Sequence, residues 1–202
     1  MKLMRVVKGL LVALALTVTF SSSAAADKPK GKVVGTISAE VAKHRANAIV
    51  YVKDAGQGTS KATVKMDQRG LIFVPRVLPI QKGTTIEFKN SDPVGHNVFT
   101  PDGDKYDLGT WPKGQTRKYT YKKSGVYRQL CKVHDDMIAF VVVLDTKYFA
   151  VSSKSGAFKL PPLPPGKYTL GVWHEKLQAE EVTIEVVDGK TTDVKIELKP
   201  KS

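Results

Sequence analysis

The chain contains one cysteine, Cys131, and it stands in a short run of potential metal ligands. His134 and Met137 follow Cys131 at intervals of three residues, and His96 lies 35 residues upstream. One thiolate, two imidazoles and one thioether make up the ligand set of a type 1 copper site, which transfers single electrons. The spacing therefore predicts that His96, Cys131, His134 and Met137 bind one copper ion.

The N-terminus has the pattern of a secretory signal. Three basic residues precede an apolar run over residues 10–20, and three alanines at 24–26 fit a small-residue cleavage site. The apolar run is too short for a membrane anchor. We expect residues 1–26 to be a signal peptide that is cleaved near Ala26, leaving a periplasmic protein with no stable membrane insertion.

The chain is strongly basic, with a formal net charge of +13. The signal segment carries three basic residues and no acids, so its removal lowers the net charge to +10. An exported chain in which no basic run alternates with aromatic residues is not expected to bind nucleic acid. The basic residues either form an ordinary solvated surface or serve a function. In the second case they attract an acidic partner or an anionic membrane face.

The residue pattern predicts an all-β protein. Runs rich in β-branched residues, such as residues 48–52, 84–88 and 139–144, are separated by glycine-containing turn signals. No segment has an apolar stripe of helical period. Residues 148–200 contain about four such runs, which are few strands for an independent sandwich. Two further runs, at 32–38 and 47–52, have no part in the metal motif.

The C-terminal block resembles the transthyretin-like and carboxypeptidase-regulatory-like family of small β-sandwiches. The resemblance rests on residues 155–160 and on the turn and strand at 163–170. The first strands of that family resemble residues 31–37 and 48–52. We therefore predict one sandwich made of residues 31–54 and 148–200, with the copper domain inserted into it. The alternative is a tandem arrangement, with domains at 31–146 and 148–200.

Residues 59–146 resemble the plastocyanin/azurin family of cupredoxins, which are Greek-key β-sandwiches. The resemblance rests on residues 62–66, 73–75 and 82–90, on the His96-Asn97 pair and on the Cys131 loop. It implies the same four copper ligands and gives Asn97 the role of holding the ligand loop by hydrogen bonds. The Cys-x2-His-x2-Met spacing is similar to the short ligand loop of amicyanins.

Other chemistries fit the motif less well. Cys131 and His134 could act as a catalytic nucleophile and its base, but the sequence shows no third residue that would orient the base. A c-type haem site needs a second cysteine, and structural zinc would favour more thiolates or histidines over Met137. A saturated mononuclear site leaves no open position for substrate, so we do not expect an enzyme.

The sequence is compatible with two functions. One is a periplasmic one-electron carrier, and the other is a periplasmic copper-binding or copper-tolerance protein. Lys132, Asp135 and Asp136 place charges on the ligand loop, which argues against an apolar docking face. They suit a polar redox partner, such as an acidic c-type cytochrome, or a role in copper homeostasis. His44 and His174 are expected to be surface residues without a function, although the inserted arrangement would place both in the outer sandwich, where they could be neighbours.

Overall fold

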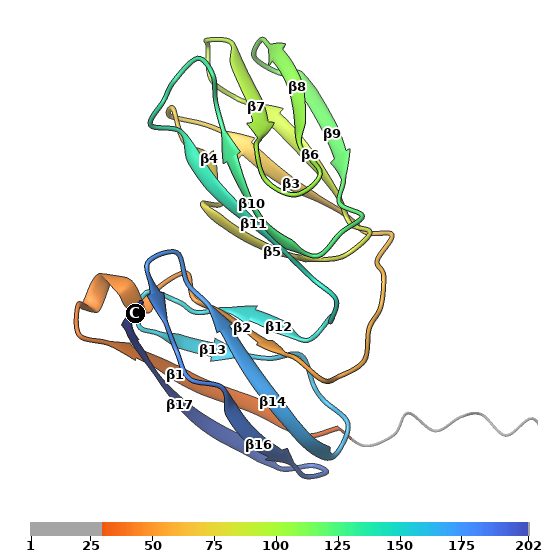
Figure 1. The fold of residues 1–202 in the computed structure, drawn as a ribbon, viewed down its shortest axis with the longest axis vertical. Helices are drawn as coiled ribbons and strands as arrows, with labels where there is room; N and C mark the ends of the chain where they lie inside the picture. The colour runs from red at the N-terminus through yellow and green to blue at the C-terminus, as the bar shows by residue number, and fades with distance from the viewer. Residues whose placement is uncertain (1–29, 202) are drawn as a thin grey trace, which may run out of the picture.

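The computed structural model describes residues 30–201, which form seventeen strands and one short 3-10 helix. The strands make four sheets that are stacked from one end of the molecule to the other (Figure 1). The all-β prediction is therefore confirmed. Within these residues no helix is long and apolar enough to cross a membrane. The predicted signal peptide, residues 1–26, lies outside the described residues.

The upper sandwich in Figure 1 holds the metal motif and consists of two sheets. The five-stranded sheet contains, in order, β5 (Val77–Gln81), β11 (Ile138–Leu144), β10 (Gly125–Leu130), β7 (His96–Thr100) and β8 (Tyr106–Trp111). The four-stranded sheet contains β4 (Phe73–Val74), β3 (Thr63–Gln68), β6 (Thr85–Asn90) and β9 (Thr116–Thr120). Large side chains fill the space between them, among them Met66, Phe88, Trp111, Tyr121 and Tyr127.

The lower sandwich, which we call the outer sandwich, also has two sheets. One contains β13 (Ala157–Lys159), β1 (Lys32–Ala39), β17 (Thr191–Pro200) and β15 (Leu177–Gln178). The other contains β12 (Phe149–Val151), β2 (Ile49–Val52), β14 (Gly166–Trp173) and β16 (Val182–Val186). The 3-10 helix η1 (Ala42–Arg45) connects β1 to β2. Apolar residues alternate with exposed ones along β1 and β17, so each strand buries one face.

Strands β1 and β2 pair with strands from the far end of the sequence. β1 lies parallel to β17 along its whole length and antiparallel to β13, and β2 lies between β12 and β14. The ladders of β3 to β11 join only strands of that group within the described residues. These pairings support the inserted arrangement over the tandem one, and we propose it as the domain organisation.

The two sandwiches pack face to face along β11. Its sequence is apolar without alternation, and nearly every residue of the strand is buried. One face of β11 points into the copper-domain core, while Phe140, Val142 and Leu144 pack with Ile49 of β2. The Phe140 ring also contacts Trp173 at 5.3 Å between centroids. A strand covered on both faces needs a continuous apolar run, which explains why this segment does not alternate.

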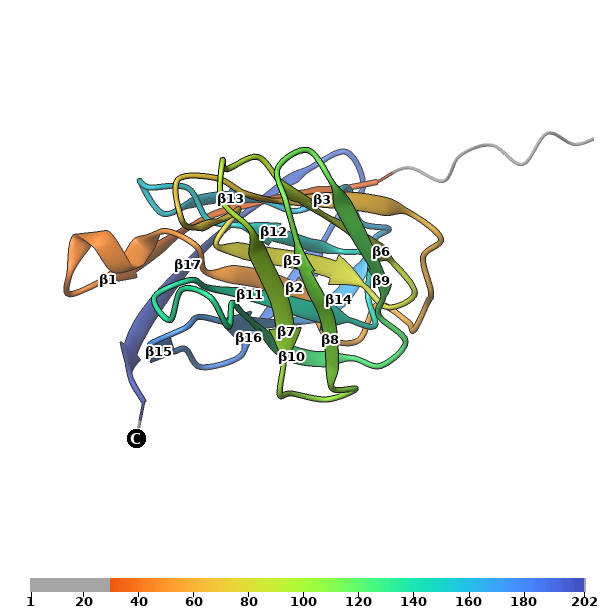
Figure 2. The ribbon, with the colours of Figure 1, turned by 90° about the horizontal axis from the view of Figure 1, so that it is seen from above.

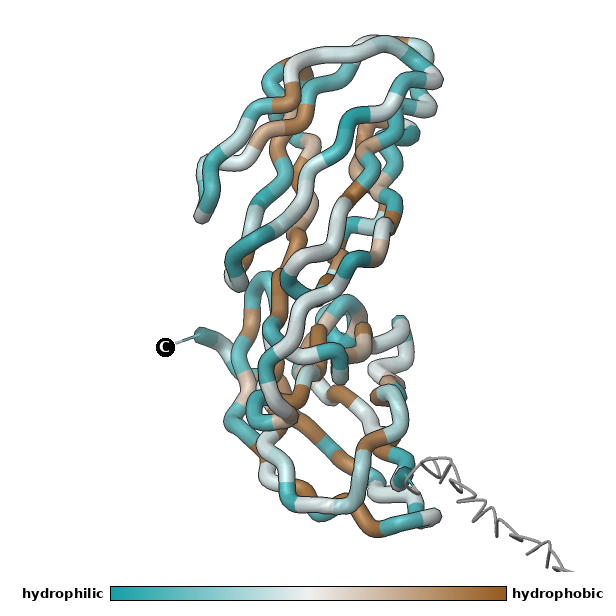
Figure 3. Tube along the Cα trace, turned by 90° about the vertical axis from the view of Figure 1, so that its right-hand side faces the viewer, coloured by the Kyte–Doolittle hydropathy of each residue, from teal (hydrophilic) through white to brown (hydrophobic). Residues whose placement is uncertain are grey.

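The views from the side and from above agree with this layering. In Figure 3 apolar and polar residues alternate along strands of both sandwiches, and the buried apolar residues form one cluster in each sandwich and a third between them. Figure 2, seen from above, shows the sheets of the two sandwiches lying over one another. The loop between β10 and β11 lies at the end of the upper sandwich, away from the outer sandwich (Figure 1).

The domain proposal predicts the effect of removing residues 30–54. This deletion takes away β1 and β2, one interior strand of each outer sheet, so residues 148–200 should lose amide protection in hydrogen exchange. A protein reduced to residues 56–147 should still fold and bind copper. Retained protection of β14 and β17 in the deleted protein would contradict the inserted arrangement and favour the tandem one.

Candidate metal centre

Two strand pairings bring the predicted ligands to one end of the sheet. His96 is the first residue of β7, and Cys131 comes directly after β10, which pairs with β7. Leu130 at the end of β10 pairs with Ile138 at the start of β11, so residues 131–137 form the loop between them. The Met137 N–H donates to the His134 carbonyl at 3.1 Å and closes this loop on itself.

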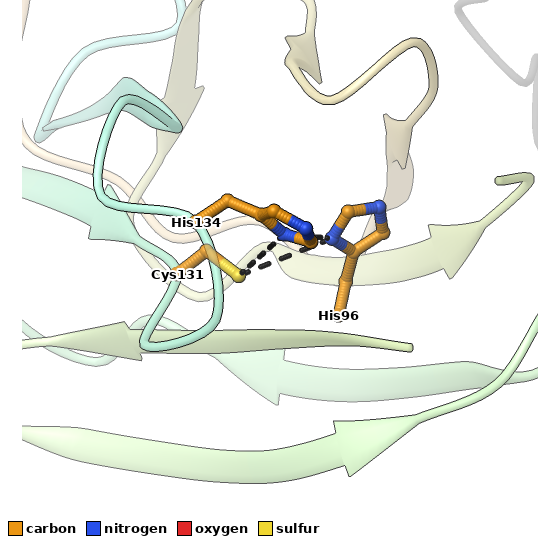
Figure 4. Close-up of side chains that lie close together, drawn as sticks. All are labelled: His96, Cys131 and His134. Atoms are coloured by element: carbon orange, nitrogen blue, oxygen red, sulfur yellow. Dashed lines mark hydrogen bonds between the residues drawn. The ribbon is translucent and has the colours of Figure 1, made fainter. Parts of the chain in front are cut away.

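Cys131, His96 and His134 point their ligand atoms toward one another (Figure 4). Cys131 Sγ lies 3.9 Å from His96 Nδ1 and 4.0 Å from His134 Nδ1, and the two Nδ1 atoms are 3.1 Å apart. With metal–nitrogen and metal–sulfur bonds of about 2.0 and 2.3 Å, a trigonal site needs N···S of about 3.7 Å and N···N of about 3.5 Å. The observed separations are within about 0.4 Å of these values, so small shifts of the side chains would let the three atoms bind one metal ion.

Asp92 fixes the orientation of the buried His96 ring. Its Oδ2 lies 2.9 Å from His96 Nε2, and its carboxylate accepts the Gly70 and Leu71 N–H groups at 2.6 and 2.9 Å. Burial raises the pKa of Asp92, but the hydrogen bonds from Leu71, Gly70 and His96 together lower it below its usual value. An ionised Asp92 accepts a hydrogen bond from Nε2–H of His96, which leaves the Nδ1 lone pair available for a metal.

Asn97 connects the Cys131 loop to β7. Its backbone N–H lies 3.4 Å from Cys131 Sγ, which suits a negatively charged thiolate. The Asn97 Oδ1 accepts the Lys132 N–H at 3.4 Å, so the same residue contacts the ligand and the residue after it.

Asp107 holds Asn97 and Lys132 together from β8. It accepts the Asn97 amide at 2.7 Å and the Lys132 ammonium at 2.6 Å. Lys132, the Gly109 N–H and Asn97 lower the pKa of Asp107 to about 2. The ion pair is largely exposed, so its contribution to stability is small and its effect is mainly on geometry.

Sequence reasoning missed Asp92 and Asp107 as supporting residues. An acidic residue four positions before a ligand histidine was a usable signal for Asp92. Asp107 gives no such signal, because a bulge between Asn97 and Phe99 sets its place beside Asn97.

Met137 is buried in the same core cluster as Cys131. This placement is compatible with a weak axial thioether, although a methionine in a core also packs without ligating. Met66 lies in that cluster too, as a core residue.

The surface near the site is more apolar than the loop charges indicated. Val133 in the ligand loop, Val94 before His96 and Leu71 beside Asp92 are 50, 43 and 49% exposed. They come from three separate segments, and we call them the apolar rim. The expectation that charges would exclude an apolar face is therefore incomplete.

Comparison with protein families agrees with this geometry. Residues 60–144 match the copper binding proteins of the plastocyanin/azurin family. Residues 138–199 match the carboxypeptidase regulatory-like domain. Both resemblances drawn from the sequence are thus confirmed. No curated protein matches the chain.

Solved structures with similar folds include three copper proteins. A copper-containing nitrite reductase from Thermus scotoductus is 24% identical over 46% of this chain and 26% of its own, with a TM-score of 0.40. The chain thus spans about a quarter of that enzyme. A purple cupredoxin from Nitrosopumilus maritimus is 21% identical over 40% of this chain and 99% of its own, with a TM-score of 0.38. A reduced amicyanin mutant is 19% identical over 47% of this chain and 98% of its own, with a TM-score of 0.39.

Residues 60–144 thus combine a match to the copper binding proteins of the plastocyanin/azurin family with a group of ligand atoms that could hold one metal ion. Thiolate and imidazole are ligands that suit copper, and the measured separations fit one ion. Within residues 30–201 no second group of three such ligand atoms is found. His96, Cys131, His134 and Met137 therefore fit one type 1 copper.

Substitution of Met137 by leucine tests the axial position. If Met137 is a weak donor, Met137→Leu should keep the copper but raise its reduction potential. Loss of the donor removes more stabilisation from the oxidised ion than from the reduced ion. Each tenfold change in that preference shifts a one-electron potential by about 59 mV. Met66→Leu is the matched control in the same core. Equal potentials for the two variants, measured by voltammetry, would show that Met137 only packs.

Proposed function

We propose that the protein is an exported one-electron carrier that acts in the periplasm. The observation that carries the proposal is the buried, pre-positioned cluster of Cys131 and two histidines in a rigid β-sandwich. Bound copper would supply the chemistry by alternating between its two oxidation states. The protein's own residues would hold one geometry for both states.

The supporting hydrogen bonds explain how that geometry is kept. Asp92 restrains His96, and Asn97 with Asp107 restrains the loop that carries Cys131 and His134. Ligands held from behind in this way move little when the charge of a bound metal changes. A site whose ligands move little between the two oxidation states favours rapid electron transfer. The same rigidity gives no advantage to a copper-storage protein, which must release its metal.

His134 is the ligand placed to contact a partner. It is half-buried, whereas His96 and Cys131 are almost inaccessible. Val133 of the apolar rim precedes it in the chain. A redox partner that covers the apolar rim would come close to the His134 ring, which gives the electron a short route to the surface.

The partner that we propose is an acidic redox protein, such as a c-type cytochrome. Without the predicted signal peptide the chain has a net charge of +10, which would attract such a partner over several ångströms of solvent. The second candidate function is copper binding for homeostasis. The exposed loop charges of Lys132, Asp135 and Asp136 favour it, because they reduce the apolar area that a partner can cover.

Electron-transfer kinetics distinguish the two functions. Reduction or oxidation of the copper protein by an acidic cytochrome, followed by stopped flow, should slow steeply as salt rises, because charges beyond about 10 Å are screened at 0.1 M salt. Val133→Ser should slow the transfer at every salt concentration. Val187→Ser, at a similarly exposed valine of the outer sandwich, is the matched control and should have no effect.

A rate that is independent of salt would contradict an acidic partner. Absence of transfer to any cytochrome, with intact copper binding, would contradict the carrier function and favour homeostasis.

A further inference from the structure

A pocket of about 300 Å³ lies where the outer sandwich meets the copper domain. His44 from η1 and His174 after β14 line it, with ring centroids 6.0 Å apart. Its other polar walls come from Lys43, Asn47, Arg76, Glu175 and Lys176, and Arg76 belongs to the copper domain. We call it the junction pocket. It shares no residue with the metal centre.

The His174 ring is held in one orientation and one protonation pattern. His174 is 7% exposed, and its Nδ1 lies 3.2 Å from the Lys176 N–H and 3.0 Å from the Leu177 N–H. Two donors on Nδ1 require its lone pair, so the proton of the neutral ring is on Nε2. Burial, and then the neighbouring His44, lower the pKa of His174 and favour this neutral form.

Nε2 of His174 is therefore a fixed N–H donor in the pocket. It has no hydrogen-bond partner among the described residues, and it is not sealed from solvent. This arrangement argues against a metal site at the two histidines, because a metal needs the lone pair that Nε2 lacks here.

The pocket is positively charged. Lys43 and Lys176 form no ion pair within residues 30–201. Glu175, the acid on the wall, is already paired with Arg76 through contacts of 2.8 and 3.2 Å. Three cations against one carboxylate give the walls a net charge of +2, the histidines not counted. Two lysines that line the same pocket as the His174 N–H donor are suited to an oxyanion.

We propose that the junction pocket binds a small oxyanion, a carboxylate or phosphate group, through the His174 Nε2–H, Lys43 and Lys176. The volume is at the lower end of the range for ligand pockets, about 300–1,000 Å³, which fits a small anion or the charged end of a larger molecule. Binding would add charge-assisted hydrogen bonds to groups that have none in the protein itself.

Nuclear magnetic resonance on the full mature chain tests this site without reference to copper chemistry. Inorganic phosphate and acetate are titrated separately against sodium chloride of equal ionic strength. We expect the ring spectrum of His174 to show the Nε2–H tautomer. At least one of the two anions should cause saturable shifts at His174 and at the Lys176 and Leu177 amides. The anion that binds more tightly identifies the group.

Charge-removing variants separate a built site from general attraction. Lys43→Gln and Lys176→Gln should each weaken binding about tenfold, the effect of losing one charged hydrogen bond. Lys190→Gln should leave it unchanged, because Lys190 precedes the far end of β17, about 30 Å away along ten residues. The amide spectra show directly whether each variant is folded.

Three results would overturn the proposal. The first is the absence of saturable shifts with either anion. The second is equal weakening by Lys190→Gln, which would indicate surface charge alone. The third is an Nδ1–H tautomer with saturable Zn²⁺ shifts at His44 and His174, which would make the pair a metal site.

Discussion

The copper site depends on the position of β10 between β7 and β11. Pairing with β7 brings Cys131 to the end of the sheet where His96 begins its strand. Pairing with β11 returns the chain after residues 131–137 and so forces His134 into the same space. Loss of either ladder would separate ligands that are far apart in the sequence. The same β11 also packs against the outer sandwich, so its two buried faces connect the metal loop to the rest of the molecule.

The ligands alone do not determine the geometry. His96 can present Nδ1 to a metal because Asp92 accepts a hydrogen bond from Nε2–H, and Asp92 is in turn held by two backbone N–H groups. Asn97 and Asp107 play the corresponding part for the ligand loop. Hydrogen bonds behind the ligands are the usual means by which a protein orients them and adjusts the metal.

The features that could be predicted from the sequence are those that depend on residues close together in the chain. Cys131, His134 and Met137 are close in the chain, and His96 with Asn97 begins a recognisable strand, so the ligand set and the all-β class could be inferred. Asp107 could not be inferred, because its contact with Asn97 depends on the register between β7 and β8 and on the bulge in that ladder. The apolar rim was missed for a similar reason: its three residues belong to different segments that only the folded chain brings near the site. The loop charges alone were therefore a poor guide to the surface. The sequence predicts surface positions for His44 and His174, but His174 is almost wholly buried. The tautomer of His174 depends on two backbone donors that no sequence pattern reveals.

The central claim is that Cys131, with His96 and His134, binds one copper ion as a type 1 site. The most direct test is titration of the mature protein with Cu²⁺, followed by visible and electron paramagnetic resonance spectroscopy, with Cys131→Ser in parallel. We predict one tightly bound copper ion per chain. It should give a strong thiolate-to-copper absorption band that a reductant bleaches and that is absent in Cys131→Ser. A colourless Cu²⁺ complex of the native protein, or a band that persists in Cys131→Ser, would contradict the account.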